Sequence, residues 1–313
     1  MMPQSVPINH HTQFSPDQGE AKDIIRDLID RRFFSETEQY GKLADWLNKR
    51  RRYKSWGIIS GTRGAGKSRA SQKYDQVANG QRGPLRRVKP LPSFYLKGFT
   101  GWGTRDICNH TLKRFNHGAR KGKPDDIRFR TKDVFEEFGL ELLLVDNAHL
   151  VSDKALQDLV ECYSCNKDGD DFRIAIVLIG PDKELDERLK RLGLRSKFGS
   201  EHKFKSLCPR QLVNVIKDFQ KNFLGLPKEV EFFDGEIIAA LCQASGGNLT
   251  NLDKAGCDFD IITEILVLSI AQSSEDGVLR LDKPVLEEVL CDFGVYLEPI
   301  VEEPDDTEPG TAG

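Results

Sequence analysis

The chain of 313 residues lacks a long apolar run, a leader-like start and a cysteine framework. Its longest apolar candidate, residues 261–271, is interrupted by Thr263 and Glu264 and is too short to cross a bilayer. The first 20 residues contain neither Lys nor Arg and no apolar block, so they do not resemble a signal peptide. Seven irregularly placed cysteines are typical of a reduced intracellular protein and not of a disulfide scaffold. We therefore expect a cytoplasmic protein with no membrane partner.

Charge is balanced overall but unevenly distributed. The 46 basic and 49 acidic residues leave a formal charge of -3, which by itself indicates no partner. Residues 81–130, however, hold 13 basic and 3 acidic residues, whereas residues 296–313 hold 6 acidic and no basic ones. A basic stretch of this kind favours an anionic partner such as the phosphate backbone of a nucleic acid. The alternative is that these side chains form an ordinary solvated face.

Two kinds of secondary-structure pattern divide the chain. Up to residue 207, short apolar segments alternate with helical ones, which is typical of a parallel sheet covered by helices on both faces. The expected strands cover 56–60, 93–96, 142–145 and 174–179, and the expected helices between them cover 68–77, 104–115, 132–138 and 154–162. Beyond residue 207 only helical patterns remain, at 211–223, 235–244, 251–271 and 284–290.

One motif carries identifiable chemistry. Residues 61–68 read GTRGAGKS and match G-x-x-x-x-G-K-[ST], directly after an apolar strand and at the start of a helix. In such a loop the backbone N–H groups surround phosphate oxygens, Lys67 contacts the β- and γ-phosphates, and the hydroxyl of Ser68 ligates Mg2+. The motif predicts a nucleoside triphosphate site, for ATP with Mg2+, formed by Gly61, Thr62, Arg63, Gly64, Ala65, Gly66, Lys67, Ser68 and Arg69.

A site of this kind also needs an acid at the end of a neighbouring strand. Asp146 follows the apolar run 142–145 and is expected to hold Mg2+ together with Ser68. Hydrolytic enzymes of this plan usually place Glu next, but this chain has Asn147. Because an amide orients a water molecule without taking its proton, we expect nucleotide binding with slow hydrolysis. The sequence NKDG at 166–169 has Gly where a guanine-specific loop needs Asp, which argues against a GTPase.

Five segments, in their order along the chain, resemble the AAA+ regulators of Tn7-like transposition, the TnsC/TniB family, which includes members from CRISPR-associated transposons. The segments are residues 33–52, the P-loop at 61–68, LLLVDNAHL at 142–150, IVLIGPD at 176–182 and GGNLTNLD at 246–253. The resemblance extends over residues 20–295. It implies an α/β fold, an AAA+ P-loop NTPase core with a parallel sheet flanked by helices, followed by a small all-helical lid.

With the resemblance, the patterns divide the chain into four regions. We expect a disordered arm at 1–20, a nucleotide-binding α/β domain with N-terminal helices at 21–207, a helical lid domain at 208–295 and an acidic disordered tail at 296–313.

The resemblance also implies partners. Such bacterial proteins bind ATP between neighbouring subunits and assemble as homo-oligomers, in rings or helical filaments, around duplex DNA. They link a target selector of the TniQ/TnsD type to a transposase of the TnsB type. Matching the two DNA-contacting loops of the family to this chain makes Arg105 and Lys123 the expected backbone contacts, with Lys121 third. The catalytic set that the resemblance implies is Lys67, Asp146, Asn147 and a finger that completes a neighbour's site, either Arg195 or Lys197.

Two other functions stay open at this point. The first is an AAA+ loader or remodelling ATPase that hydrolyses ATP productively, which Asn147 disfavours because such an enzyme needs an efficient base. The second is a nucleotide-regulated signalling module without a DNA role, in which the basic stretch is only a solvated face. Failure to bind duplex DNA at low salt with ATP present would favour the signalling module.

Overall fold

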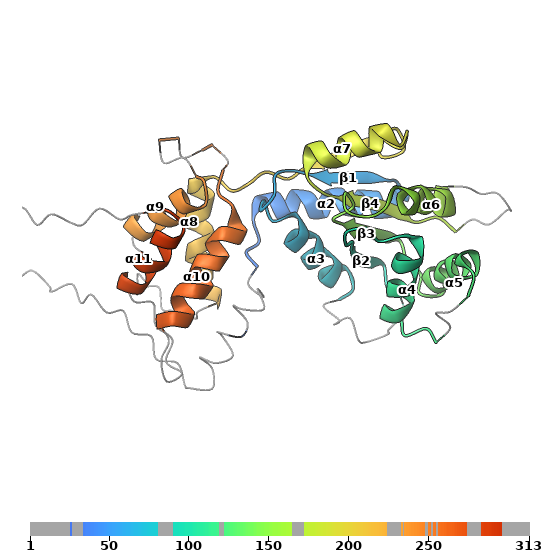
Figure 1. The fold of residues 1–313 in the computed structure, drawn as a ribbon, viewed down its shortest axis with the longest axis horizontal. Helices are drawn as coiled ribbons and strands as arrows, with labels where there is room; N and C mark the ends of the chain where they lie inside the picture. Colours follow the sequence, from blue (N-terminus) through green and yellow to red (C-terminus); the bar gives the residue numbers. More distant parts are fainter. Residues whose placement is uncertain are drawn as a thin grey trace, which may run out of the picture.

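The computed structural model describes residues 26, 34–80, 90–118, 122–164, 172–223, 233, 235–247, 250–251, 253–254, 256–273 and 283–295. Its centre is a five-stranded parallel sheet with the strand order β2-β3-β4-β1-β5 (Figure 1). The strands are β1 (Gly57–Ser60), β2 (Ser93–Lys97), β3 (Leu142–Asp146), β4 (Ala175–Ile179) and β5 (Ser200–Lys203). The expected arm at 1–20, the expected tail at 296–313 and Lys121 lie outside the described residues.

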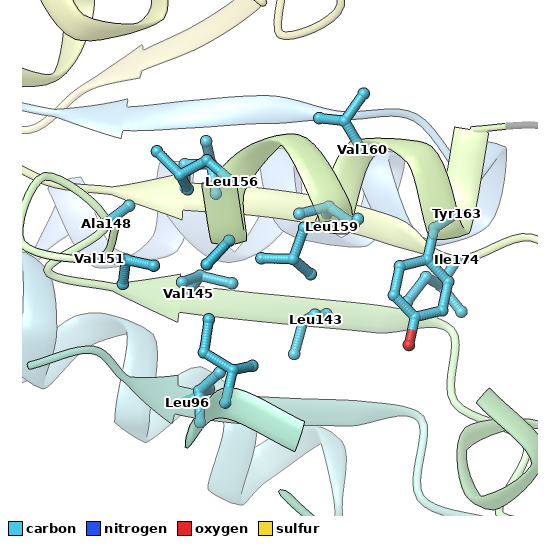
Figure 2. Packing of buried hydrophobic residues seen from close by; sticks show 14 of the residues in the cluster. Leu96, Leu143, Val145, Ala148, Val151, Leu156, Leu159, Val160, Tyr163 and Ile174 are labelled. Atoms are coloured by element: carbon cyan, nitrogen blue, oxygen red, sulfur yellow. The ribbon is translucent and has the colours of Figure 1, made fainter. Parts of the chain in front are cut away.

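Helices cover both faces of this sheet. Successive side chains of a strand point to opposite faces, so the apolar run of β3 contributes to two hydrophobic clusters. Leu143 and Val145 belong to the cluster formed with α4, α5, α6 and α7, which Figure 2 shows, whereas Leu142 and Leu144 belong to the cluster formed with α2 and α3. The helices are α2 (Glu38–Tyr53), α3 (Lys67–Ala78), α4 (Thr104–Arg114), α5 (Pro124–Glu137), α6 (Asp153–Ser164) and α7 (Asp182–Arg191).

The chain beyond Leu207 folds into helices with a hydrophobic cluster of their own. These elements are α8 (Pro209–Asp218), the π-helical turn η1 (Phe219–Phe223), α9 (Gly235–Ala244), α10 (Phe259–Ser273) and α11 (Lys283–Asp292). Their apolar sides meet around fully buried residues such as Leu212, Ile265 and Leu286. Figure 1 shows this helical part beside the sheet, next to α2 and α3. Among the helices that the structure describes, none combines the length and the apolar character needed to span a membrane.

The predicted fold class, a parallel sheet flanked by helices, is confirmed. The sequence patterns did not predict β5 or α7. β5 reads SEHK and lies at the edge of the sheet, where it pairs with β1 alone, so no apolar pattern marks it. α7 is mostly charged and buries only Leu185 and Leu189, one turn apart.

Two helices begin eight residues away from their predicted start. α5 starts at Pro124 instead of residue 132, with proline in its first turn and the acids Asp125 and Asp126 beside it, all of which favour a helix start. α10 starts at Phe259 instead of residue 251. The side chain of Asp258 accepts a hydrogen bond from the backbone N–H of Asp260 at 2.9 Å and so caps this helix.

Candidate functional site

The P-loop connects the end of β1 to the start of α3. Its path depends on glycine, because Gly61 and Gly64 have φ angles of +147° and +69°, which other residues rarely adopt. A Cβ atom at Gly61 would lie 2.0 Å from the carbonyl oxygen of Phe204, so the chain leaving β5 closes against the loop. α3 begins at Lys67 with Gly66 as its N-cap and without a side-chain cap. A helix start preceded by such a loop is suited to bind a phosphate group.

Lys67 is held inside this loop. Its side chain is 8% exposed, and its Nζ donates hydrogen bonds to the carbonyl oxygen of Gly61, at 3.0 Å, and to that of Thr62. Burial lowers the pKa of Lys67, and the nearby carboxylate of Asp146 opposes this shift. The ammonium group therefore lies at the loop, where a phosphate group would replace the carbonyl oxygens as its partner.

Arg63 and Thr62 connect the P-loop to two other parts of the chain. Arg63 forms an ion pair of 2.8 Å with Glu184 of α7, and the hydroxyl of Thr62 lies 2.7 Å from that of Ser206. Ala65 is buried and Arg69 lines a pocket beside the loop. The loop is thus supported by α7 and by the segment that follows β5.

The two predicted magnesium ligands meet at a tyrosine that the sequence patterns did not single out. Asp146 ends β3 and is 2% exposed. The hydroxyl of Tyr95, on the adjacent strand β2, donates a hydrogen bond to Asp146 Oδ2, and the side chain of Ser68 is close enough to act on the pKa of this hydroxyl. Burial and the Asp146 carboxylate raise the pKa of Tyr95, so Tyr95 stays a neutral donor. A carboxylate and a hydroxyl brought together in this way are the oxygen ligands that Mg2+ prefers.

Asn147 follows Asp146 in a left-handed conformation. Its φ angle is +51°, and its backbone N–H donates to Asp146 Oδ1 at 2.9 Å. Asparagine tolerates this region of φ and ψ far better than glutamate does. The backbone at this position therefore favours the amide over the carboxylate that hydrolytic enzymes of this plan carry.

An apolar pocket lies beside Ala65 and Gly66 of the P-loop, and the sequence patterns did not indicate this pocket. The segment before α2, the P-loop with the first turn of α3, and the helices beyond Leu207 each contribute to its wall. At the start of α10, the backbone N–H of Phe259 donates to the carbonyl oxygen of Gly64 at 3.2 Å, which holds α10 against the loop. The pocket is lined by Phe34, Ser35, Thr37, Gln39, Tyr40, Ala65, Gly66, Arg69, Ala70, Phe204, Leu207, Val215 and Phe259.

The residues predicted to contact DNA lie at the starts of two helices that pack together. Arg105 is exposed in the first turn of α4, and Lys123 is exposed at the N-cap of α5. Asp158 of α6, 5% exposed, accepts a hydrogen bond from Thr104 and lies 3.3 Å from a guanidinium nitrogen of Arg128. One buried carboxylate therefore holds the first turn of α4 and the second turn of α5 in a common arrangement.

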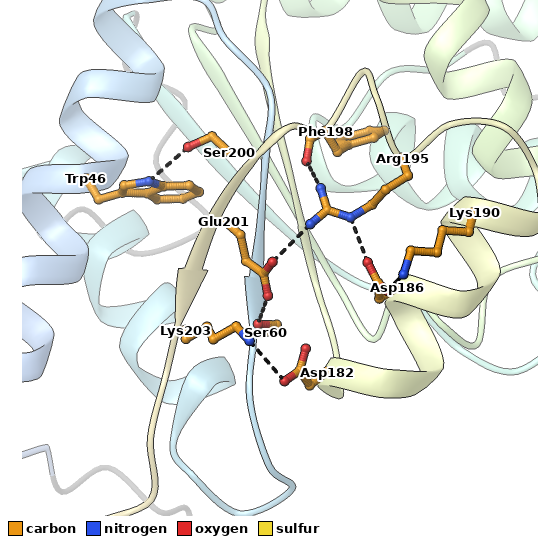
Figure 3. A network of polar contacts seen from close by, with 10 residues as sticks. All are labelled: Trp46, Ser60, Asp182, Asp186, Lys190, Arg195, Phe198, Ser200, Glu201 and Lys203. Atoms are coloured by element: carbon orange, nitrogen blue, oxygen red, sulfur yellow. Dashed lines mark hydrogen bonds and ion pairs between the residues drawn. The ribbon is translucent and has the colours of Figure 1, made fainter.

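The two candidates for the finger differ in their surroundings. Arg195 donates to Asp186 Oδ1 at 2.7 Å, to the carbonyl oxygen of Phe198 at 2.7 Å and to Glu201 Oε2 at 3.0 Å (Figure 3). Its guanidinium group thus joins α7 to β5 within one subunit. Lys197 is exposed on the turn between these two elements.

Comparisons with known proteins agree with this geometry. Residues 50–189 match the family model AAA_22, described as an AAA domain. No curated protein matches the chain in sequence. Among solved structures, the chain is similar to Cdc6p from Pyrobaculum aerophilum, with a TM-score of 0.59 and 16% identity over 80% of this chain and 65% of that one. It therefore spans less than two thirds of the length of Cdc6p.

Two structures from Aeropyrum pernix are also similar. The ORC2 protein, described as ADPNP-ADP complexes, has a TM-score of 0.63 and 14% identity over 86% of this chain and 71% of that one. The ORC1 protein in complex with DNA has a TM-score of 0.51 and 10% identity over 92% of this chain and 68% of that one. At these identities the likeness concerns the fold. Over residues 50–189 the chain is therefore similar to AAA domains, and its parallel sheet flanked by helices has the α/β fold of these solved structures.

Proposed function

We propose that this protein binds ATP with Mg2+ at the P-loop. The observation that carries the proposal is the meeting of Ser68 and Asp146 at the hydroxyl of Tyr95, beside the buried ammonium of Lys67. Ser68 and Asp146 would hold the metal, which supplies positive charge against the phosphates when bound. The apolar pocket beside Gly66 and Ala65 suits a purine base. The phosphates would contact Gly61, Thr62, Arg63, Gly64, Ala65, Gly66, Lys67, Ser68 and Arg69.

The same site is proposed to hydrolyse ATP slowly. Asn147 lies next to Asp146, and its amide orients a water molecule without accepting a proton. Slow turnover makes the ATP-bound state long-lived, which suits a switch better than a motor. We retain Lys197 as the finger that reaches a neighbouring subunit, since Lys197 is exposed whereas Arg195 is partly buried between α7 and β5.

The bound nucleotide is proposed to control assembly on duplex DNA. Arg105 and Lys123 would contact phosphates without reading sequence, and both lie in the basic stretch at 81–130. The fold agrees with this role, since the similar ORC1 structure is a complex with DNA. With the resemblance to the TnsC/TniB family, these features favour an adaptor that oligomerises on target DNA and links a TniQ/TnsD-type target selector to a TnsB-type transposase.

Sedimentation with a long DNA duplex tests the proposal. Large complexes should form only when protein, DNA and either ATP or a non-hydrolysable analogue are present together. The variant Lys67→Ala should form none, because it loses the charge that holds the phosphates. Complexes that disperse rapidly with ATP but persist with the analogue would instead support a productive loader or remodelling ATPase. Protein that binds ATP and no duplex at low salt would support the signalling module.

The salt dependence of duplex binding tests the two contact residues. Each lost phosphate contact lowers the slope of log affinity against log salt by about 0.9, so Arg105→Ala with Lys123→Ala should lower it by about 2. The matched control removes two exposed lysines from the helical lid, Lys217→Ala with Lys221→Ala, and should keep the wild-type slope. Equal slopes for the two double variants would remove α4 and α5 from the DNA contact.

A further inference from the structure

The loop between β2 and α4, residues 98–103, presents an aromatic ring to solvent. Phe99 is 47% exposed, and its ring packs on that of Trp102 with the centroids 4.8 Å apart. The ammonium of Lys97 lies 5.9 Å from the centroid of the Phe99 ring. An aromatic ring exposed beside a cation, with a second ring beneath it, is an arrangement used to contact nucleic acid bases and sugars.

The position of this loop favours DNA as its partner. The loop ends at Gly103, the N-cap of α4, so Arg105 follows in the first turn of that helix. The acidic residue nearest to Phe99 in the sequence is Asp106, and its Oδ2 atom accepts a hydrogen bond from the backbone N–H of Gly103 at 2.9 Å. Lys97 places positive charge beside the ring of Phe99, and Arg105 adds a second cation six residues later in the chain. Charge of this sign around an apolar ring complements a phosphate backbone with a groove between its strands.

Backbone hydrogen bonds fasten the loop to the segment that follows Asp146. The N–H of Gly98 donates to the carbonyl oxygen of Asp146 at 2.8 Å, and the N–H of Gly101 donates to that of Leu150 at 3.0 Å. The N–H of Ser152 donates in return to the carbonyl oxygen of Trp102 at 2.9 Å. These bonds hold the ring of Phe99 in place before any contact is made, and they connect the loop to the strand that ends in the proposed metal ligand.

Close packing at Gly98 makes this connection stiff. A Cβ atom at Gly98 would lie 2.7 Å from a methyl group of Val151 and 2.9 Å from the carbonyl oxygen of Asp146, so the two segments touch without space for a side chain. A shift of β3 at its carboxyl end would therefore move the loop with it.

We propose that Phe99, supported by Trp102 and Lys97, is an apolar contact to duplex DNA in addition to the phosphate contacts of the proposed function, on which this inference rests. The ring packs against deoxyribose and base edges within a groove. The occupant is the duplex and not a neighbouring subunit, because the ammonium of Lys97 lies beside the ring and the exposed Arg105 follows in the first turn of α4. The contact forms in the ATP-bound state, since the loop is fastened to the segment after Asp146.

Duplex binding by Phe99→Ala, measured by fluorescence anisotropy with ATP over a range of salt concentrations, tests this proposal. Affinity should fall about tenfold at every salt concentration, as expected for loss of one aromatic–base contact. The salt slope should stay at the wild-type value, because a phenyl ring displaces no counterions. Phe99→Trp should restore affinity. This combination separates Phe99 from Arg105, whose loss changes the slope.

Tyr53 provides a matched control. It is 67% exposed at the end of α2, and the guanidinium of Arg52 lies 5.9 Å from its ring centroid, so Tyr53→Ala removes a ring with similar surroundings at another place. It should bind DNA as wild type does. Wild-type affinity of Phe99→Ala, a changed salt slope, or weakened ATP binding in the absence of DNA would each overturn the aromatic contact. Wild-type protein that binds no duplex with ATP would refute the proposed function itself.

Discussion

A single carboxylate in the P-loop helix is expected to limit the stability of this protein. Asp75 lies on α3, where burial raises its pKa from 3.8 to about 6, and no hydrogen-bond partner of its Oδ1 atom is found among the described residues. At about 1.4 kcal/mol per pH unit, the rise corresponds to about 3 kcal/mol lost when the buried carboxyl is ionised. Asp75→Asn removes this charge at nearly constant shape. It should raise the free energy of unfolding by about 2 to 3 kcal/mol at pH 8.

The stability gained by Asp75→Asn should be largest at high pH and should decrease as the pH falls. Because the folded state binds the proton of Asp75 more tightly than the unfolded state, the wild type recovers stability as pH falls from about 7 to 4. The advantage of Asp75→Asn should therefore shrink to below about 1 kcal/mol at pH 4. Urea unfolding of both proteins, followed by circular dichroism at pH 8, 6 and 4, measures this difference in the free energy of unfolding. Asp45→Asn, on the exposed side of α2, is the charge-matched control. A variant Asp75→Asn that is destabilised at pH 8, or equally stabilised at every pH, would refute the reasoning.

Three further predictions concern the candidate site. Asn147→Glu should speed ATP hydrolysis at least about tenfold, while its left-handed φ angle costs about 1 kcal/mol of folding stability; an unchanged phosphate-release rate would show that another group positions the water. Arg195→Met should lower the free energy of unfolding by about 2 kcal/mol because it removes two ion pairs and the hydrogen bond to the carbonyl oxygen of Phe198. Lys197→Ala should instead keep the melting temperature and lose ATP-dependent assembly. The reverse pattern in thermal melts and sedimentation would make Arg195 the finger. Asp158→Asn should weaken duplex binding by about 1 kcal/mol, a factor of about five, without changing ATP affinity, and equal loss in both titrations would indicate general unfolding.

The parts of the fold with local signals could be predicted. The glycines, lysine and serine of a phosphate loop stand together at 61–68, and a run of four apolar residues ending in Asp146 reads as a buried strand with an acid at its tip. The alternation of such strands with helical patterns also predicts a parallel sheet, because parallel strands need a crossover between them. β5 has no such signal. Its residues are polar, and they form a strand because β1 leaves an edge to pair with and Arg195 pairs with Glu201.

By itself, then, the sequence determined that this chain has a P-loop, a strand ending in an acid, an asparagine after it and a parallel α/β sheet. Tertiary structure decided which distant side chains meet. Tyr95 lies 51 residues before Asp146 in a strand that reads SFYLK, and only the pairing of β2 with β3 brings its hydroxyl to that carboxylate. The apolar pocket likewise needs several segments from both parts of the chain. Periodicity records which face of an element is buried, but it does not record the partner that buries it.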